Sequence, residues 1–370
     1  MKLDTKRTVL VGFAFLSICA FWQMYDNLVP LILTNTFHLN ETISGAIMAA
    51  DNVMALFLLP LFGGLSDKCT SRLGRRRPFI LFGTLAAICL MLLLPLFADS
   101  YHAAPGGGKI ALFICVLGLL LVAMGTYRSP AVALMPDITP KPLRSKANAI
   151  INLMGAVGGI LYLLITTFLY HVKSETYVSF FPLFAIVAGI MAAALAVVMS
   201  FVNEPELVKK QQEYERKHPE DDLTEHTAQG DTLPADVKKS LTFLLVSISL
   251  WFVGYNGVST WFSVYAENIW GMSLGQANTC LTIATGGAIL SYIPIGTVAS
   301  RIGRRKTIRF GTLLLSGSFL AAFLLTMALE GFSPVLYLLF LLVGLAWASI
   351  NVNSLPMVVE MCKGSEVGKF

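Results

Sequence analysis

The sequence predicts an all-α integral membrane protein, and three observations lead to this fold class. Of the 370 residues, 55% are hydrophobic and only 13% are charged. A soluble domain carries about 25% charged residues, so this chain lacks the polar side chains needed to cover a surface in water. The apolar residues form long continuous runs, and the basic residues are confined to alternate loops between them.

The continuous apolar runs are long enough to cross a bilayer as helices. A spanning helix needs about 20 apolar residues, and within lipid only helices and closed barrels satisfy every backbone polar group. The runs do not alternate between apolar and polar residues, so we expect helices. The first run is too long, and lacks a small-residue cleavage site, for a removable signal peptide. We predict ten spans, at 8–34, 43–65, 78–98, 110–135, 148–170, 179–202, 241–266, 275–299, 308–329 and 333–356.

Lysine and arginine predict the orientation of the spans. The two ends of the chain and every second loop together hold 24 of the 27 basic residues. The opposite loops hold only Lys109 and Lys173, and Arg128 falls inside a span. Because cytoplasmic loops retain basic residues, we expect both termini in the cytoplasm of a multi-pass protein of the cell membrane.

A charged segment divides the chain into two related halves. We predict a six-helix N-terminal half at 1–202, a hydrophilic cytoplasmic linker at 203–240 and a four-helix C-terminal half at 241–370. The linker is expected to be a solvated tether, partly helical over 206–217, and a regulatory docking role is the alternative. The stretch RLGRRR beginning at Arg72 returns as RIGRRK beginning at Arg301. A complete second repeat would need two more helices, so we expect a truncated chain.

The arginine-rich loop carries a resemblance to a known family. The stretch GLSDKCTSRLGRRRP (64–78) resembles the G-x-x-x-D-R-x-G-R-R signature of the major facilitator superfamily. Its longer form, together with MPDITPKPLRSKANAIINLMGAVGG (135–159), resembles proton-coupled sucrose carriers and, more widely, glycoside–pentoside–hexuronide cation symporters. The resemblance implies two parallel-repeat helical halves, alternating access and a proton-coupled sugar substrate.

The sequence departs from these relatives at two places. The second span has no D-x-x-N-D-P motif, so the sodium-binding carboxylates of the wider group are absent, and Asp51 lies one turn earlier. Val132 stands where sucrose carriers place an arginine, and Arg128 lies one turn before it. Both shifts leave open which residue performs which role.

Three ionisable residues lie well inside predicted spans: Asp26, Asp51 and Arg128. A charge near the bilayer centre costs about 2.5–3.5 kcal/mol, so each is a candidate for function. We assign the coupling proton to Asp51 and the sugar to Asp26, because first-helix carboxylates bind sugar in the symporters that the chain resembles. The alternative is a static pair, with Arg128 neutralising one aspartate for folding alone.

Polar and aromatic residues in the spans complete the predicted substrate site. Trp251 and Tyr255 share one helix face, where aromatic rings can stack on a sugar, but packing or lipid-facing aromatics explain them equally. The predicted substrate-binding residues are Asp26, Gln23, Asn27, Arg128, Asn152, Trp251, Tyr255 and Asn256.

The two arginine loops predict a cytoplasmic gate. Asp67 is placed to accept hydrogen bonds from nearby arginines in one state of a rocking cycle, which would make the loop a switch. A purely topogenic role for the arginines is the alternative. The predicted gate residues are Asp67, Arg72, Gly74, Arg75, Arg76, Arg77, Arg301, Gly303, Arg304 and Arg305.

The sequence shows no nucleophile constellation, metal-ligand cluster or nucleotide-binding motif. We therefore expect no enzyme activity, no metal, no cofactor and no nucleic-acid partner. The expected partners are a sugar, protons and the lipid bilayer, and we expect a monomer. Two alternative functions remain: an exporter of drugs or other small molecules, and a non-transporting truncated homologue.

Overall fold

All regular secondary structure in the described part of the chain is helical. The computed structural model describes residues 4–140, 144–170, 177–217, 235–329 and 331–361, and no strand occurs within these ranges. The predicted all-α membrane fold is confirmed. Nine helices in these ranges are long and apolar enough to cross a membrane.

The helices fall into two compact units. The first comprises residues 1–165 and 175–222, and the second comprises 166–174 and 223–370. Helices of the first unit are α1 (Thr5–Leu31), η1 (a π-helical turn, Ile32–Thr36), α2 (Glu41–Asp67), α3 (Arg77–Ala103), α4 (Gly107–Ile138), α5 (Arg144–Leu169, whose last turn belongs to the second unit), α6 (Phe181–Phe201) and α7 (Glu204–Lys217). Helices of the second are α9 (Ala235–Trp270), α10 (Leu274–Ile302), α11 (Arg304–Ala328) and α12 (Val335–Met361).

Each predicted span overlaps a helix over nearly its whole length; most helices are longer than the predicted span, and α6 is slightly shorter. Nine of the ten predictions match the nine apolar helices. The tenth, 275–299, lies within the 29-residue helix α10, whose first turns carry Gln276, Asn278 and Thr279 and which is not among those nine. The helix expected over 206–217 within the linker is present as α7, while 218–234 lies outside the described residues.

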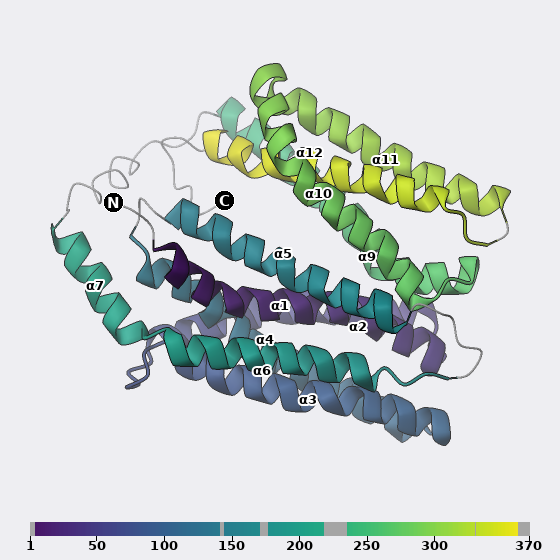
Figure 1. Ribbon diagram of the computed structural model, residues 1–370, viewed down its shortest axis with the longest axis horizontal. Helices are drawn as coiled ribbons and strands as arrows, with labels where there is room; N and C mark the ends of the chain where they lie inside the picture. Colours follow the sequence, from purple (N-terminus) through teal and green to yellow (C-terminus); the bar gives the residue numbers. More distant parts are fainter. Residues whose placement is uncertain (1–3, 141–143, 171–176, 218–234, 330, 362–370) are drawn as a thin grey trace. The chain divides into compact units, whose positions relative to one another are not determined.

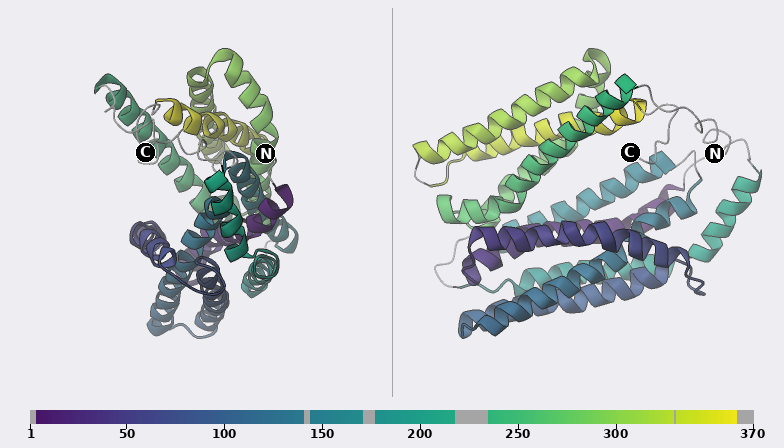
Figure 2. Two further views of the ribbon diagram at one scale, coloured as in Figure 1. Left: turned by 90° about the vertical axis from the view of Figure 1, so that its left-hand side faces the viewer. Right: turned by 180° about the vertical axis from the view of Figure 1, so that it is seen from behind.

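In the first unit, α3 packs against α4 and α6, and α6 also packs against α1. Figure 1 shows α3, α4 and α6 running side by side, and the right-hand view of Figure 2 shows the same bundle from behind. In the second unit, α12 packs against both α10 and α11. The two units therefore use related helix pairings, as their repeated sequence predicts.

Glycines allow several of these helices to approach closely. A Cβ atom on Gly158 of α5 would lie 2.0 Å from the carbonyl oxygen of Leu16 on α1. The same distance separates a Cβ on Gly344 of α12 from the carbonyl oxygen of Ala284 on α10. Real atoms cannot approach so closely, so these positions require glycine, as small-residue interfaces in membranes commonly do.

Candidate functional site

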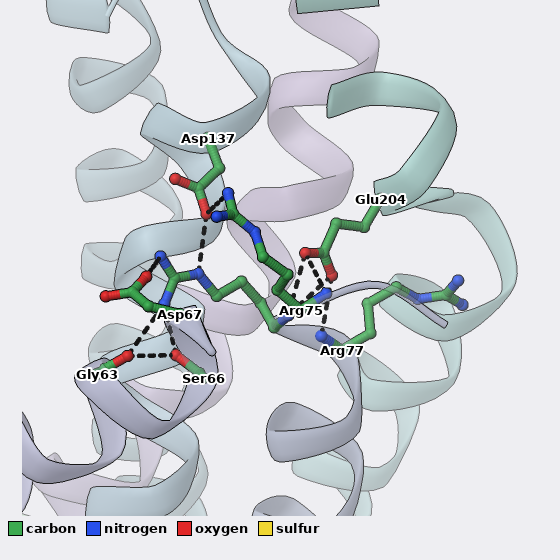
Figure 3. Close-up of polar contacts among 8 residues, drawn as sticks. Gly63, Ser66, Asp67, Arg75, Arg77, Asp137 and Glu204 are labelled. Carbon is green, nitrogen blue, oxygen red and sulfur yellow. Dashed lines mark hydrogen bonds and ion pairs between the residues drawn. The ribbon is translucent and has the colours of Figure 1, made fainter. Parts of the chain in front are cut away.

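The loop between α2 and α3, which we call the arginine loop (residues 68–76), is held by a carboxylate from another helix. Glu204, the first residue of α7, is only 1% exposed. Its carboxylate accepts backbone N–H bonds from Arg75 (2.8 Å), Arg76 (3.0 Å to each oxygen) and Arg77 (3.0 Å). These groups form the N-terminus of α3, where free N–H donors and the helix dipole favour a negative charge. Figure 3 shows Glu204 directed at this turn.

Gly74 makes this approach possible. Its φ of +111° lies in the left-handed region that glycine adopts without strain. A Cβ atom at this position would lie 2.3 Å from Oε2 of Glu204. The glycine of the repeated motif is therefore required both by the backbone conformation and by the close approach of the Glu204 carboxylate.

Arg76 is the centre of a second group of contacts. Arg76 is 5% exposed; Nε donates to Oδ2 of Asp137 at 2.8 Å, and Nη2 forms an ion pair with Asp67. Nη1 donates to the hydroxyl of Ser66 and, at 3.3 Å, to the carbonyl oxygen of Gly63. These contacts, drawn in Figure 3, join the ends of α2 and α4 to the start of α3.

The charge state of Arg76 follows from these contacts. Burial disfavours the charged form of the guanidinium, but the hydrogen bond and charge of Asp137, together with the charge and hydrogen bond of Asp67, outweigh it and raise the pKa of Arg76. The network therefore contains a permanently charged arginine between two carboxylates. Asp137 is the more buried of the two, with 20% of its side chain exposed against 56% for Asp67.

The neighbouring arginines differ in their contacts. Arg75 lies 3.6 Å from the Asp137 carboxylate, and the guanidinium of Arg77 donates to the carbonyl oxygen of Met199 on α6. Arg72 is exposed and forms no ion pair with any described residue. The structure thus brings together Asp67, Gly74, Arg75, Arg76 and Arg77 of the predicted gate. It adds Ser66, Asp137 and Glu204, which were not predicted as gate residues.

A signal for Glu204 is present in the sequence, because it directly precedes Pro205 at the start of a polar helix, where proline and acidic residues both favour a helix N-terminus. Nothing in the sequence shows that the carboxylate faces the arginine loop, since 127 residues separate it from Arg77. Only the packing of α6 and α7 on α3 and α4 brings them together.

The corresponding loop of the second unit shares the backbone turn. Gly303 joins α10 to α11 with a φ of +93°, and a Cβ there would meet open space. Arg301 and Arg305 are exposed, and Arg304 is partly buried. In the repeated signature Ser300 takes the place of the aspartate. The two loops are therefore similar in backbone conformation, and they differ in sequence at the position of the signature aspartate.

The three ionisable residues predicted to lie well inside spans all belong to the first unit. Asp26 lies on α1, Asp51 on α2 and Arg128 on α4. The guanidinium carbon of Arg128 lies 5.5 Å from the ring centroid of Trp22, in a cation–π geometry. Asp51, Arg128 and Trp22 line one small cavity, whose remaining walls come from α2 and α4. The cavity combines an acceptor, a cation and an aromatic ring within apolar walls.

The other predicted substrate residues of the first unit have different surroundings. Asn27 is buried, and its side-chain oxygen accepts a hydrogen bond from the hydroxyl of Tyr162 on α5 at 2.8 Å. This contact ties α1 to α5. Gln23 is partly buried on α1, and Asn152 is exposed on α5.

On α9, Trp251 and Tyr255 pack against Trp347 of α12, with ring centroids 5.0 Å and 3.9 Å apart. Both also contact a buried apolar cluster of α11 and α12. Asn256, next to Tyr255, is exposed. Trp347 is an addition from the structure, because its place beside α9 depends on how α9 and α12 pack.

The fold and these sites define a multi-pass membrane protein built from two helical repeats, each with an arginine-rich loop between its second and third spans. Residues 11–370 match the Major Facilitator Superfamily. The chain belongs to this family.

Sequence relatives and solved structures are consistent with that membership. The chain is 33% identical over 146 residues to Sucrose transport protein SUC3 of Arabidopsis thaliana, covering 36% of this chain and 24% of that protein. It is 39% identical over 114 residues to Sucrose transport protein SUC4 of the same plant, covering 29% and 22%. The matched region thus spans about a quarter of the length of these curated relatives.

The fold is similar to that of several solved transporters. The inward-open structure of the xylose transporter XylE from E. coli aligns with a TM-score of 0.63 at 15% identity, covering 93% of this chain and 79% of that one. A bacterial homologue of the human drug peptide transporters PepT1 and PepT2 aligns with a TM-score of 0.65 at 13% identity, covering 98% and 86%. At this identity the likeness concerns the fold alone.

Proposed function

We propose that this protein is a secondary active transporter that carries a sugar, of the disaccharide or glycoside class, together with protons. The observation that carries the proposal is the pair of carboxylates, Asp26 and Asp51, within membrane-spanning helices of a major facilitator chain. Such residues are expensive in a bilayer and mark substrate or ion pathways. The names of the sucrose carriers support a sugar as the substrate.

Within this proposal the two carboxylates have separate tasks. Asp51 shares its cavity with Arg128 and takes the coupling proton, whose arrival frees the guanidinium from a negative neighbour. Asp26 accepts hydrogen bonds from sugar hydroxyls. A carboxylate beside the substrate couples the proton to the sugar, because binding of either one changes the free energy of binding the other.

The Arg76 network is the proposed inner gate. If the arginine loop lies in the cytoplasm, as the distribution of lysine and arginine indicates, both termini are cytoplasmic too. Arg76 then holds α2, α3 and α4 together in one state of an alternating-access cycle, through Asp67 and Asp137. Contacts made in only one state are what a conformational switch requires.

A drug exporter is the rival function, and one feature of the second unit bears on it. An apolar groove between α9, α11 and α12 is lined by aromatic residues that include Trp261, Phe319 and Phe323. The repeat can be aligned by its two Gly-Thr pairs, at 83–84 and 311–312. In this alignment Phe319 and Ala322 of α11 correspond to Met91 and Leu94 of α3, which are fully buried. In the first unit α6 covers α3 and α1, so we interpret the groove as a helix-packing surface.

Uptake into vesicles tests the proposal. The full chain, reconstituted into liposomes, is offered labelled sucrose, maltose and an aryl glucoside, with and without an inward proton gradient. We expect accumulation of at least one sugar that depends on the gradient and collapses with a protonophore. Gradient-driven extrusion of a cationic dye without any sugar uptake would favour the exporter instead.

A further inference from the structure

Two side-chain donors on α1 are buried without a hydrogen-bond partner among the described residues. They are the phenol hydroxyl of Tyr25 and the indole N–H of Trp22. The whole Tyr25 side chain is 1% exposed. The large majority of buried side-chain polar atoms in proteins are hydrogen-bonded, and an unmatched buried donor destabilises the structure that contains it. Each of these two groups therefore needs an explanation.

The surroundings of the two donors point to a ligand. The rings of Trp22 and Tyr25 meet edge to face with centroids 5.3 Å apart. Trp22 lines the cavity that contains Asp51 and Arg128, and Arg128 lies over its ring. Asp26 directly follows Tyr25 on α1, and Asp51 lines the same cavity as Trp22. Two donors and two acceptors are thus gathered in one region of the first unit.

Another phenol buried in the same helix bundle shows the contrast. Tyr162 on α5 is also inaccessible, but its hydroxyl donates to the side-chain oxygen of Asn27 at 2.8 Å. The packing of this unit can therefore satisfy a buried tyrosine. Burial of a phenol in this bundle therefore does not by itself explain why Tyr25 has no partner among the described residues.

The first helix of the second unit, α9, also carries a buried indole N–H without a partner among the described residues. On α9, the indole nitrogen of Trp251 is buried and has no hydrogen-bond partner in the described part of the chain. Trp251 and Tyr255 have the spacing of Phe21 and Tyr25 on α1, and their rings pack beside Trp347. Each half thus carries an unmatched indole donor on its first helix.

We propose that Tyr25 and Trp22 form a donor pair of the substrate site, which holds acceptor oxygens of a polyhydroxylated ligand such as a sugar. The inference rests on the proposed function and deepens it. An indole N–H only donates and an ionised carboxylate only accepts, whereas a hydroxyl group does both. A sugar hydroxyl therefore satisfies Tyr25 or Trp22 with its oxygen and Asp51 or Asp26 with its hydrogen. A protonated hydrophobic amine presents no acceptor on its ammonium group and leaves both donors unmatched.

The test compares two substitutions that each remove one donor and keep the ring. Tyr25→Phe removes only the hydroxyl, and Trp22→Phe removes the N–H while retaining an aromatic face for Arg128. We expect each to weaken binding of labelled sucrose or maltose by about 3- to 10-fold, which is the loss of one hydrogen bond. We also expect no fall in melting temperature for Tyr25→Phe, because the ligand-free protein loses no bond.

Tyr162→Phe is the matched control, because it removes a partnered phenol hydroxyl from the same bundle. It should lower the melting temperature and leave sugar affinity within about twofold. If the wild-type chain binds sugar and Tyr25→Phe and Trp22→Phe bind equally well, the donor pair is refuted while sugar transport stands. A loss of stability in Tyr25→Phe without a loss of affinity would refute it too. If the wild-type chain binds neither sugar, the proposed function fails and this inference fails with it.

Discussion

Replacement of Gly74 by alanine tests whether Glu204 holds the arginine loop. The φ of +111° strains any residue with a side chain, and strain of this kind costs about 1–3 kcal/mol. The new Cβ would lie 2.3 Å from Oε2 and 2.5 Å from Cδ of Glu204, so the carboxylate must move. Each charged hydrogen bond that it loses costs about 1.5–3 kcal/mol. With strain and one lost bond, the free energy of unfolding should fall by about 2.5–6 kcal/mol.

The second unit offers a matched control for this substitution. Gly303 has a similar φ of +93°, but its Cβ would meet nothing within 4 Å. Gly303→Ala therefore introduces backbone strain without a clash and should cost only about 1–3 kcal/mol. The difference between the two variants isolates the contact with Glu204.

Unfolding of each variant in mixed detergent and denaturant measures these free energies. The same two substitutions are then made in a Glu204→Ala background, where Gly74→Ala should cost no more than Gly303→Ala. The reasoning is refuted if Gly74→Ala and Gly303→Ala destabilise the wild-type chain equally. It is also refuted if removal of Glu204 leaves the effect of Gly74→Ala unchanged.

The remaining predictions concern coupling, gating and helix packing. Asp51→Asn should abolish proton-driven accumulation of sugar and spare exchange across the membrane; full accumulation by this variant would remove Asp51 from the coupling role. Asp67→Asn should slow turnover several-fold with little change in KM, and a pure affinity defect in uptake assays would contradict the gate. Gly158→Ala places a Cβ 2.0 Å from a carbonyl oxygen of α1 and should destabilise the protein by about 1–3 kcal/mol. Gly159→Ala, whose nearest contact is 3.6 Å away, should change stability by less than about 0.5 kcal/mol in the same unfolding assay.

The predicted gate illustrates how far motif reasoning reaches. The signature places Asp67 near the arginines, and the structure pairs Asp67 with Arg76. The signature does not distinguish among the four arginines within residues 64–78, of which Arg76 is buried and Arg72 is exposed. Spacing along a loop specifies which residues are neighbours, while burial depends on the helices that close around them.

The predicted substrate residues also show which properties the sequence predicts and which depend on packing. Asn27 was predicted from its polarity within a span, and the structure places its side chain in a hydrogen bond with Tyr162. Trp22 and Tyr25 stand in the same stretch of sequence, yet their unmatched donors become visible only when every neighbour is known. Composition identifies a polar group in a membrane; only the three-dimensional contacts show whether that group is already satisfied.

The sequence by itself determined that this chain is helical, crosses the membrane many times, and is built from two repeats with arginine-rich loops. Those properties follow from local quantities: the length of apolar runs, the positions of lysine and arginine, and repeated motifs. Tertiary structure alone decided that Glu204 caps α3, that Asp137 completes the Arg76 network, and that Tyr25 has no hydrogen-bond partner among the described residues. These depend on contacts between helices far apart in the chain, because a side chain's charge pairing and hydrogen bonding are set by what packs against it.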